Sequence, residues 1–213
     1  MPSDPKTQLK KTKGALTAAR ILDAAESLFA HQGYDGTSLR QIADKSGIKE
    51  PGLYNHFAGK QALYEAVLHR ALNPMANALS AHLERATGLH DYTDLPSVMT
   101  DLFMDHPQIA ALFQQAMQGE KDSLGNQLVY RWLDTLFSQG VKSMGKVEGI
   151  GEQDQATLAI NVIALFNITT GYFLSQRAFE TMAAGKLTDP DNIARQKRLL
   201  HKVIRAMLIS QAS

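Results

Sequence analysis

Hydrophobic residues recur at spacings of three and four along most of the chain, and no segment alternates hydrophobic and polar positions as a half-buried strand does. This pattern predicts an all-α fold. Helices are expected over residues 17–31, 60–85, 95–106, 107–118, 126–147, 154–184 and 191–209, with a shorter helical pair between the first two.

Proline residues should interrupt this pattern. Pro74 is expected to kink or break its helix near Asn73, because proline lacks an N–H donor and disfavours helical geometry at the preceding residue. Pro96 and Pro107 suit the first turn of a helix. The stretch TGLHDYTD, residues 87–94, is expected to be a loop.

The shorter helical pair lies in residues 37–57, which read TSLRQIADKSGIKEPGLYNHF. Ser38 followed three residues later by Gln41 fits a capping box at the start of the first helix, with Thr37 as an alternative cap. Gly47 stands where one apolar-periodic segment ends and another begins, so it suits a left-handed turn position. By spacing alone, the stretch fits a helical hairpin in a larger bundle as readily as a helix-turn-helix that enters DNA.

The last two predicted helices carry more hydrophobic surface than one chain can cover. Residues 154–184 are apolar on almost all sides, and residues 191–209 have a strong apolar face, which implies burial on most faces. We therefore expect a homodimer in which both helices pair with their symmetry mates in a four-helix arrangement. Gly171, Ser175 and Ala178 would permit close approach. The alternative is that both helices are core within one chain.

Composition places the protein among soluble globular proteins, with 213 residues of which 44% are hydrophobic. The chain has no cysteine, which excludes disulfides and thiolate chemistry and, with no signal-peptide pattern, favours the cytoplasm. The most apolar stretch, residues 158–168, is only about half as long as a membrane span, so no membrane partner is expected. Residues 1–70 carry a net charge of +3 and the remainder −2, which places any polyanionic partner at the N-terminal part.

The motifs of common enzymes are not found in the sequence. It contains no G-x-S-x-G elbow, no H-E-x-x-H and no glycine-rich phosphate loop. Asp101, Asp105 and His106 form one cluster of acids and imidazole, but they precede Pro107 at an expected helix boundary, where such residues commonly serve as caps. We therefore expect no enzymatic activity, no cofactor and no metal site. A helical interaction or ligand-binding protein without DNA binding is the alternative to a DNA-binding protein.

From Thr37 to Lys60 the sequence resembles the TetR family of bacterial transcriptional regulators. The family pattern has a T-S-x-x-x-I-A helix, a G-[VI] turn, an L-Y-x-H-F recognition segment and a following lysine. The matching residues here are Thr37, Ser38, Ile42, Ala43, Gly47, Ile48, Leu53, Tyr54, His56, Phe57 and Lys60. The match extends back to Thr17. The sequence departs from the pattern at Ser46, where alanine is common, and at Lys49, where serine or threonine is common.

This resemblance implies a domain organisation and a function. A flexible basic arm over residues 1–13 would precede a three-helix DNA-binding domain over residues 14–60, and a helical effector-binding and dimerisation domain would occupy residues 61–213. The expected function is a sequence-specific regulator, a repressor released from a double-stranded DNA operator by a small-molecule effector. Coupling between the two domains would run along the helix that begins at Lys60 and passes Pro74.

The resemblance also implies roles for individual residues. Thr37 and Ser38 would offer hydroxyl and backbone N–H groups to phosphates, where the helix dipole favours an anion. Tyr54, His56 and Lys60 would hold the DNA backbone. Base reading would be done by residues in or beside the short recognition helix, namely Arg40, Lys49, Glu50, Pro51 and Gly52.

Candidate residues for binding the effector are large apolar side chains and one amide in the C-terminal part of the chain. Apolar walls with an occasional polar group suit a small ligand. The same side chains at helical spacing would equally form ordinary core. The candidates are Phe103, Met104, Phe113, Met117, Trp132, Phe137, Phe166 and Asn167.

Overall fold

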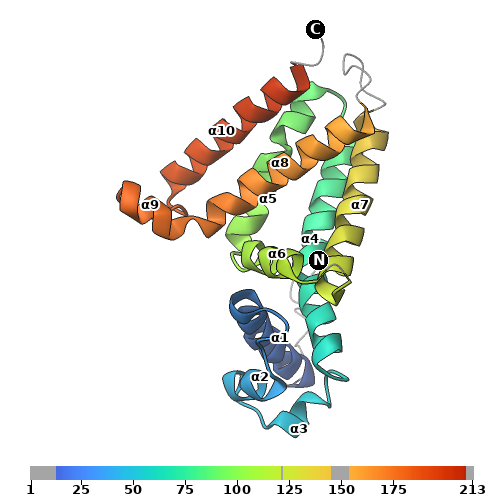
Figure 1. Cartoon of the computed structure of the whole chain (residues 1–213), viewed down its shortest axis with the longest axis vertical. Helices are drawn as coiled ribbons and strands as arrows, with labels where there is room; N and C mark the ends of the chain where they lie inside the picture. Colours follow the sequence, from blue (N-terminus) through green and yellow to red (C-terminus); the bar gives the residue numbers. More distant parts are fainter. Residues whose placement is uncertain (1–12, 121, 145–153, 210–213) are drawn as a thin grey trace, which may run out of the picture.

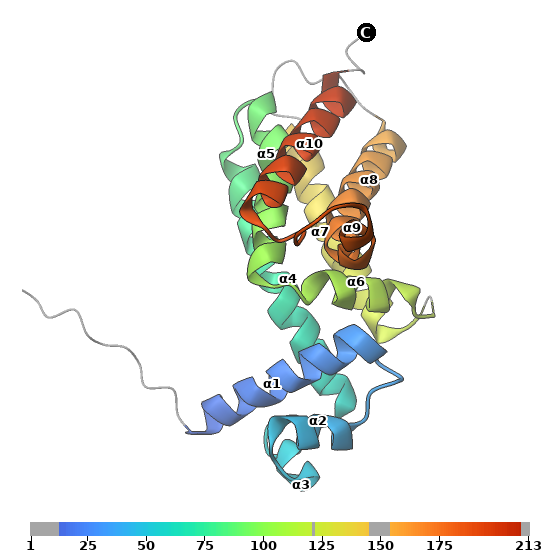
Figure 2. The same ribbon diagram turned by 90° about the vertical axis from the view of Figure 1, so that its left-hand side faces the viewer.

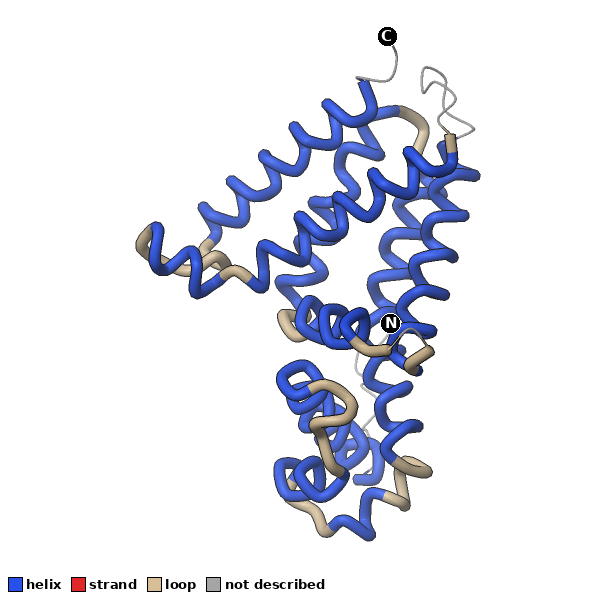
Figure 3. Tube along the Cα trace, in the orientation of Figure 1, coloured by secondary structure: helices blue, strands red, loops and turns tan. Residues whose placement is uncertain are grey.

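The computed structural model describes residues 13–120, 122–144 and 154–209, and the described part is helical with no strand (Figures 1 and 3), so the all-α prediction is confirmed. Its helices are α1 Lys13–Gln32, α2 Leu39–Ser46, α3 Glu50–Leu53, α4 Lys60–Arg85, α5 Leu89–Asp105, α6 Ile109–Gln118, α7 Leu124–Met144, α8 Gln155–Leu174, α9 Gln176–Met182 and α10 Pro190–Ile209. The predicted basic arm falls almost wholly on residues 1–12, outside the described residues.

Helix α4 is the spine of the molecule. Its first turns lie among α1, α2 and α3 at one end, and its later turns lie in the larger helical part formed by α5 to α10 (Figures 1 and 2). In that larger part α4 packs against α5 and α7, and α10 packs along α5. Helix α6 crosses between the two ends and packs against α1 on one side and α7 and α8 on the other.

The break predicted near Asn73 is not present, because α4 is continuous from Lys60 to Arg85 with Pro74 inside it. Proline removes one helical hydrogen bond, so packing must hold the two halves of the helix in line. Leu72 and Met75, on either side of the proline, are buried in the core. The carbonyl of Leu72 also accepts a hydrogen bond from the indole of Trp132 in α7, at 3.1 Å. Contacts distant in sequence therefore stabilise the helix where the local signal favours its end.

The loop predicted over residues 87–94 is helical from Leu89 onward, so that prediction was wrong. The Asp91 carboxylate accepts hydrogen bonds from the backbone N–H groups of Thr87 and Gly88, at 2.7 and 3.0 Å, and so caps the start of α5. These bonds from Thr87 and Gly88 lower the pKa of Asp91. The acid that looked like a loop residue is thus the cap of a helix.

Two other boundaries differ from the predictions for related reasons. Because α5 begins early, Pro96 lies inside the helix rather than in its first turn. The helix predicted over residues 154–184 is divided into α8 and α9 at Ser175, whose hydroxyl donates to the carbonyl of Gly171 at 2.6 Å. A hydroxyl that bonds back to the preceding turn competes with the helix ladder.

The hydrophobic core is continuous from the N-terminal helices into the C-terminal ones. At the N-terminal end Phe29, Tyr34 and Tyr64 pack ring against ring, with centroids 4.8 to 6.2 Å apart. Burial raises the pKa of Tyr64 to about 12. Because buried residues of α4 belong to this same cluster, the two ends of the molecule are joined by packed side chains.

Helix α8 is poorly covered by its own chain. Ile160 is 65% exposed and Ile163 is 57% exposed, and Leu174 on the same face is also exposed. By length and composition this helix could cross a membrane, although the apolar stretch of residues 158–168 had been expected to be too short. Part of the apolar surface of α8 thus lies outside the core of its own chain, although Phe166 of the same helix is buried. Helix α10 in contrast buries Ile193 and Leu200 within the chain.

Candidate nucleic-acid interface

Helix α2 begins and ends at the residues that the sequence predicted. The Ser38 hydroxyl accepts a hydrogen bond from the backbone N–H of Gln41 at 3.2 Å, and the Gln41 side chain accepts from the backbone N–H of Ser38 at 2.7 Å. This reciprocal pair is a capping box. At the other end Gly47 has φ +69° and ψ +35°, and the N–H of Ile48 donates to the carbonyl of Ala43 at 3.1 Å. The predicted cap and left-handed turn are both confirmed.

Helix α3 is a single turn, Glu50–Leu53, at the extreme end of the molecule (Figure 1). Leu53 is buried and anchors it, while Lys49, Glu50 and Pro51 are exposed. Pro51 lies in the first turn, where its missing N–H costs nothing. Glu50 lies there too, and a carboxylate is favourable near the positive end of a helix dipole. The turn at Gly47 therefore presents a short helix whose outer face is free to meet a partner.

Most of the residues predicted to contact DNA lie on this end of the molecule with accessible surface. Ser38, Arg40, Lys49, Glu50, Pro51 and Tyr54 are exposed, and Gly52, His56 and Lys60 are partly exposed. They come from the start of α2, from α3 and from the start of α4, so the fold brings together residues up to 22 positions apart.

Thr37 differs from its neighbour and does not fit the role predicted for its hydroxyl. Its side chain is buried, with 2% exposure, and its hydroxyl donates to the carbonyl of Gly33 at 2.8 Å. Its backbone N–H donates to the carbonyl of Tyr34 at 3.3 Å. Both donors are used inside the protein, so Thr37 holds the turn between α1 and α2 instead of contacting phosphate.

The ammonium group of Lys60 lies over the aromatic ring of Tyr34, a residue that the sequence analysis did not single out. Its Nζ lies 4.3 Å from the ring centroid of Tyr34, in the loop between α1 and α2. A cation over an aromatic face is attracted by the ring's negative potential. Burial, with Asp35 and Glu65 nearby, raises the pKa of the Tyr34 hydroxyl. Sequence reasoning missed Tyr34 because it is 26 positions from Lys60, and only the fold brings them into contact.

The charged residues Asp23, Glu26 and Arg70 link α1 to α4. Arg70 donates to the Asp23 carboxylate at 2.7 Å and also contacts Glu26. Burial lowers the pKa of Arg70, but the hydrogen bonds that it donates to Glu26 and Asp23 more than offset this, so the pKa is raised overall. The orientation of α1 relative to α4 is thereby fixed by an ion pair as well as by apolar packing.

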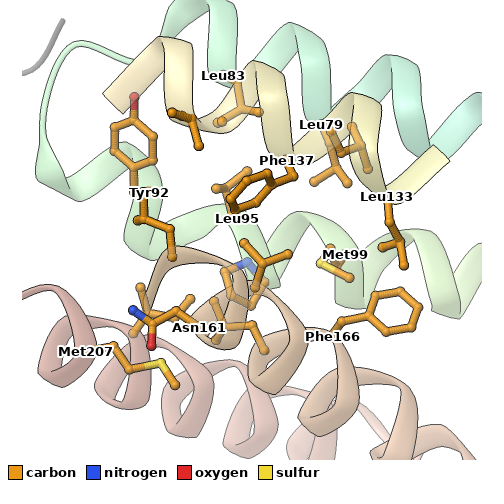
Figure 4. A pocket seen from close by; sticks show the side chains of 18 of the residues that line it. Leu79, Leu83, Tyr92, Leu95, Met99, Leu133, Phe137, Asn161, Phe166 and Met207 are labelled. Atoms are coloured by element: carbon orange, nitrogen blue, oxygen red, sulfur yellow. The ribbon is translucent and has the colours of Figure 1, made fainter. Parts of the chain in front are cut away.

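A second feature is a cavity of about 160 Å³ in the C-terminal part, lined by residues of α4, α5, α7, α8 and α10 (Figure 4). Of the predicted effector residues, Trp132, Phe137 and Phe166 line it. The wall is otherwise formed mainly by aliphatic side chains, among them Leu79, Leu83, Leu95, Met99, Leu133, Leu158, Leu165, Ile204 and Met207.

The other five candidate effector residues do not line the cavity. Phe103 and Phe113 are buried in ordinary core, where Phe113 packs edge to face on Phe166 with centroids 4.6 Å apart. Met104, Met117 and Asn167 are exposed on the surface. Periodicity showed which helices have an apolar face, but it did not show which side chains pack fully and which leave a gap.

Besides Tyr92 and Trp132, the cavity wall has a polar side chain at Asn161, which was not among the candidates. It shares a helical stripe with Leu158 and Leu165, three residues before it and four after it, whereas Asn167 lies with exposed Ile163. The spacing of these three residues could have predicted that Asn161 faces the cavity, because residues three and four apart share one face of a helix.

The capped helix-turn-helix at one end and the apolar cavity at the other define a helix-turn-helix protein with an appended all-helical domain. Comparison with known proteins agrees with this class. The sequence model of the bacterial regulatory proteins, tetR family, matches residues 21–67. The match covers the end of α1, the helix-turn-helix of α2 and α3, and the first turns of α4, so this N-terminal part of the chain is similar to the family.

Individual relatives match over about half of the chain. The HTH-type transcriptional regulator RutR of Escherichia coli strain K12 is 34% identical over 97 residues, which cover 46% of this chain and 46% of RutR. The HTH-type transcriptional activator FasR of Mycolicibacterium smegmatis is 26% identical over 121 residues, 49% of this chain and 55% of FasR. The chain thus spans about half the length of the curated relatives it matches.

Solved structures extend the likeness in fold to nearly the whole chain. The ketosteroid transcriptional regulator KstR2 of Mycobacterium tuberculosis has a TM-score of 0.67 at 18% identity, covering 90% of this chain and 92% of KstR2. At this level of identity the likeness concerns the arrangement of the helices.

Proposed function

We propose that this chain is a transcriptional regulator that binds a double-stranded DNA operator as a homodimer and is released by a small-molecule effector. The observation that carries the proposal is the left-handed turn at Gly47, which presents Lys49, Glu50 and Pro51 on an exposed short helix at the free end of the molecule. A short helix of this kind reads bases in the major groove when neighbouring residues hold the backbone. Such a regulator acts in the cytoplasm, and a repressor fits the release mechanism.

Residues 14–60 would form the DNA-binding domain and residues 61–213 the effector-binding and dimerisation domain. Ser38, Tyr54, His56 and Lys60 are assigned to the DNA backbone, and Arg40, Lys49, Glu50, Pro51 and Gly52 to base reading. The accessible surface of these nine residues supports the assignment.

The dimer would form through α8 and α10. Ile160, Ile163 and Leu174 lie on one exposed stripe of α8, and Leu199 is exposed on α10. Apolar surface of this extent on a helix favours burial against a second copy of the same surface. Two copies would also place two recognition helices on one DNA duplex, which a four-residue helix needs in order to be selective.

Effector binding would reach the DNA-binding domain through α4 and α6. Leu79 of α4 lines the cavity, and Arg70 of the same helix pairs with Asp23 of α1. On α6, Phe113 packs on Phe166 of the cavity wall while the side chain of Gln115 closely approaches Gly33 at the end of α1. A ligand that binds one arrangement of α4 and α6 better than another would shift the position of the DNA-binding domain. The affinity for the operator would change as a result.

The test is binding to operator DNA over a range of salt concentrations, with fragments selected from the source genome. Affinity should fall steeply as salt rises, because contacts with phosphate release condensed counterions. No binding to any genomic fragment at low salt would contradict the proposal.

Two variants separate contacts with the backbone from contacts with bases. Tyr54→Phe should weaken binding about fivefold on every sequence, since one hydrogen bond to phosphate is lost. Lys49→Ala should change the preference at particular base pairs. Lys142→Ala, which removes an exposed lysine at the far end of α7, serves as the control and should change neither. Equal, sequence-independent losses in the Tyr54 and Lys49 variants would refute this division of roles.

A further inference from the structure

The cavity wall holds one polar group whose hydrogen bond is missing. The Nδ2 of Asn161 is buried and has no hydrogen-bond partner among the described residues. The indole N–H of Trp132, in the same wall, is already used by the carbonyl of Leu72. An unpaired buried donor is destabilising and uncommon in native proteins, so it requires an explanation. Asn161 lies among the side chains that line the cavity (Figure 4), and an oxygen atom on a bound ligand would supply the acceptor.

The wall also restricts the charge of the ligand. None of the described residues that line the cavity is an aspartate, glutamate, lysine, arginine or histidine. Moving a charged group into hydrocarbon without a counter-charge is very unfavourable. A carboxylate, a phosphate or an ammonium group would therefore be rejected, and an uncharged molecule would be accepted.

The volume of the cavity restricts the size of the ligand. The cavity measures about 160 Å³. A cavity of about 150 Å³ lined by aliphatic and aromatic side chains holds a ligand the size of benzene. The ligand is thus a compact ring or a short branched chain rather than a long acyl chain.

We propose that the cavity binds a compact, uncharged ligand that has an apolar body and one carbonyl oxygen, and that this oxygen accepts a hydrogen bond from Asn161 Nδ2. The inference rests on the proposed function in treating the cavity as the effector site. The binding step itself needs no DNA and can be measured separately.

Three probes of nearly equal shape test the ligand class on the full chain: cyclohexyl methyl ketone, ethylcyclohexane and cyclohexanecarboxylate. Titration calorimetry should show the ketone binding about fivefold more tightly than the hydrocarbon, for one hydrogen bond, and at least about tenfold more tightly than the carboxylate. Trp132 is the only tryptophan in the chain, so its emission reports occupancy of the cavity directly. Equal binding of ketone and carboxylate, or binding of none of the three, would overturn the proposal.

Asn161→Leu tests the residue. The affinity of this variant for the ketone should be about fivefold lower than that of the unaltered chain, so the ketone should no longer bind more tightly than ethylcyclohexane. The affinity for ethylcyclohexane should be at least as high as before. The matched control is Asn77→Leu, which replaces an exposed amide on α4 outside the cavity and should leave all three affinities unchanged. A ketone preference that survives in a folded Asn161→Leu protein would refute the role of Asn161. If that variant does not fold, the comparison of probes on the unaltered chain still decides the ligand class.

Operator binding without ligand, measured on the same protein, separates this inference from the proposed function. Protein that binds DNA but prefers the carboxylate would overturn the ligand class and leave the regulator intact. Ketone binding through Asn161 in a protein that binds no DNA would support the ligand class and refute the regulator.

Discussion

Thr37 and Ser38 are adjacent hydroxyl residues at the start of α2, yet they have different roles. Ser38 caps the helix and is exposed, whereas Thr37 is buried with its hydroxyl bonded to the carbonyl of Gly33. Their difference comes from the turn after α1, where Gly33 has φ +71° and brings its carbonyl toward Thr37. Only one of the two is therefore available to a phosphate.

Ser46 shows how a departure from the family pattern is accommodated. It is buried where alanine is common, and its hydroxyl donates to the carbonyl of Ala43 at 3.1 Å. A buried hydroxyl that is hydrogen-bonded costs little, so the turn into α3 is preserved.

Gly125 is required by a close approach between α7 and its neighbours. A Cβ added there would lie 2.6 Å from the Tyr64 hydroxyl and 3.2 Å from the Cα of Ala116. Gly125→Ala should lower the free energy of unfolding by about 1–3 kcal/mol, the usual cost of overpacking a core. Urea unfolding monitored by circular dichroism measures this change.

The control is Gly140→Ala in the same helix, where a Cβ would meet nothing within 4 Å. There alanine should be neutral or stabilising by up to about 1 kcal/mol, because glycine is a poor helix former. Equal stability of the two variants would show that Gly125 is not sterically required.

At the scale of elements, helix boundaries depend on single polar groups. Helix α5 begins at Leu89 because Asp91 accepts the free N–H groups of Thr87 and Gly88. Helix α8 begins after Asp154 in a similar way, since that carboxylate accepts hydrogen bonds from the side chain and backbone of Thr157, which lower its pKa.

Asp91 should make the stability of the protein depend on pH in the acidic range. Its folded pKa is lowered, chiefly by the hydrogen bonds from Thr87 and Gly88, so its contribution is present above the unfolded pKa of about 3.9 and is lost as pH falls through the folded pKa. Asp91→Asn should therefore be less stable than the natural protein at pH 7, and the difference should shrink below about pH 4.

Denaturant unfolding at several pH values between 7 and 3 measures this effect. Asp154→Asn provides an independent second case at α8 and should behave in the same direction. A stability difference that stays constant over the whole range would contradict the role of either carboxylate.

At the scale of the whole molecule, a continuous core joins the cavity to the N-terminal helices. Phe113 on α6 packs against both Trp132 and Phe166 of the cavity wall, and α6 also packs against α1. A change in the cavity therefore has a direct path of contacts to the end that carries α2 and α3.

The exposed stripe of α8 leads to a prediction about assembly. Ile163→Asp should weaken dimerisation at least tenfold, because an unpaired carboxylate in an apolar interface costs more than the roughly 1.4 kcal/mol that a tenfold change represents. Sedimentation velocity over a range of protein concentrations measures the dimer affinity. Operator affinity should fall in parallel.

Tyr130→Asp is the matched control, since Tyr130 is also an exposed hydrophobic residue but lies on α7. It should leave the dimer intact. A dimer that tolerates Ile163→Asp as well as Tyr130→Asp would place the interface elsewhere.

The sequence by itself determined the features that depend on neighbours a few residues apart. The capping box of Ser38 and Gln41 and the turn at Gly47 are made by such neighbours, so spacing and residue type were sufficient. The all-α fold and the family match over residues 21–67 also follow from residue types and their spacing along the chain.

Tertiary structure alone decided the features that depend on contacts between distant segments. The passage of α4 through Pro74 needs the packing of α7, and the burial of Thr37 needs the turn after α1. The positions of Asn161 inside the cavity and of Asn167 outside it depend on how five helices leave a gap. Periodicity marks the side of a helix that faces inward, but packing between elements decides whether that side meets a neighbour, a cavity or solvent.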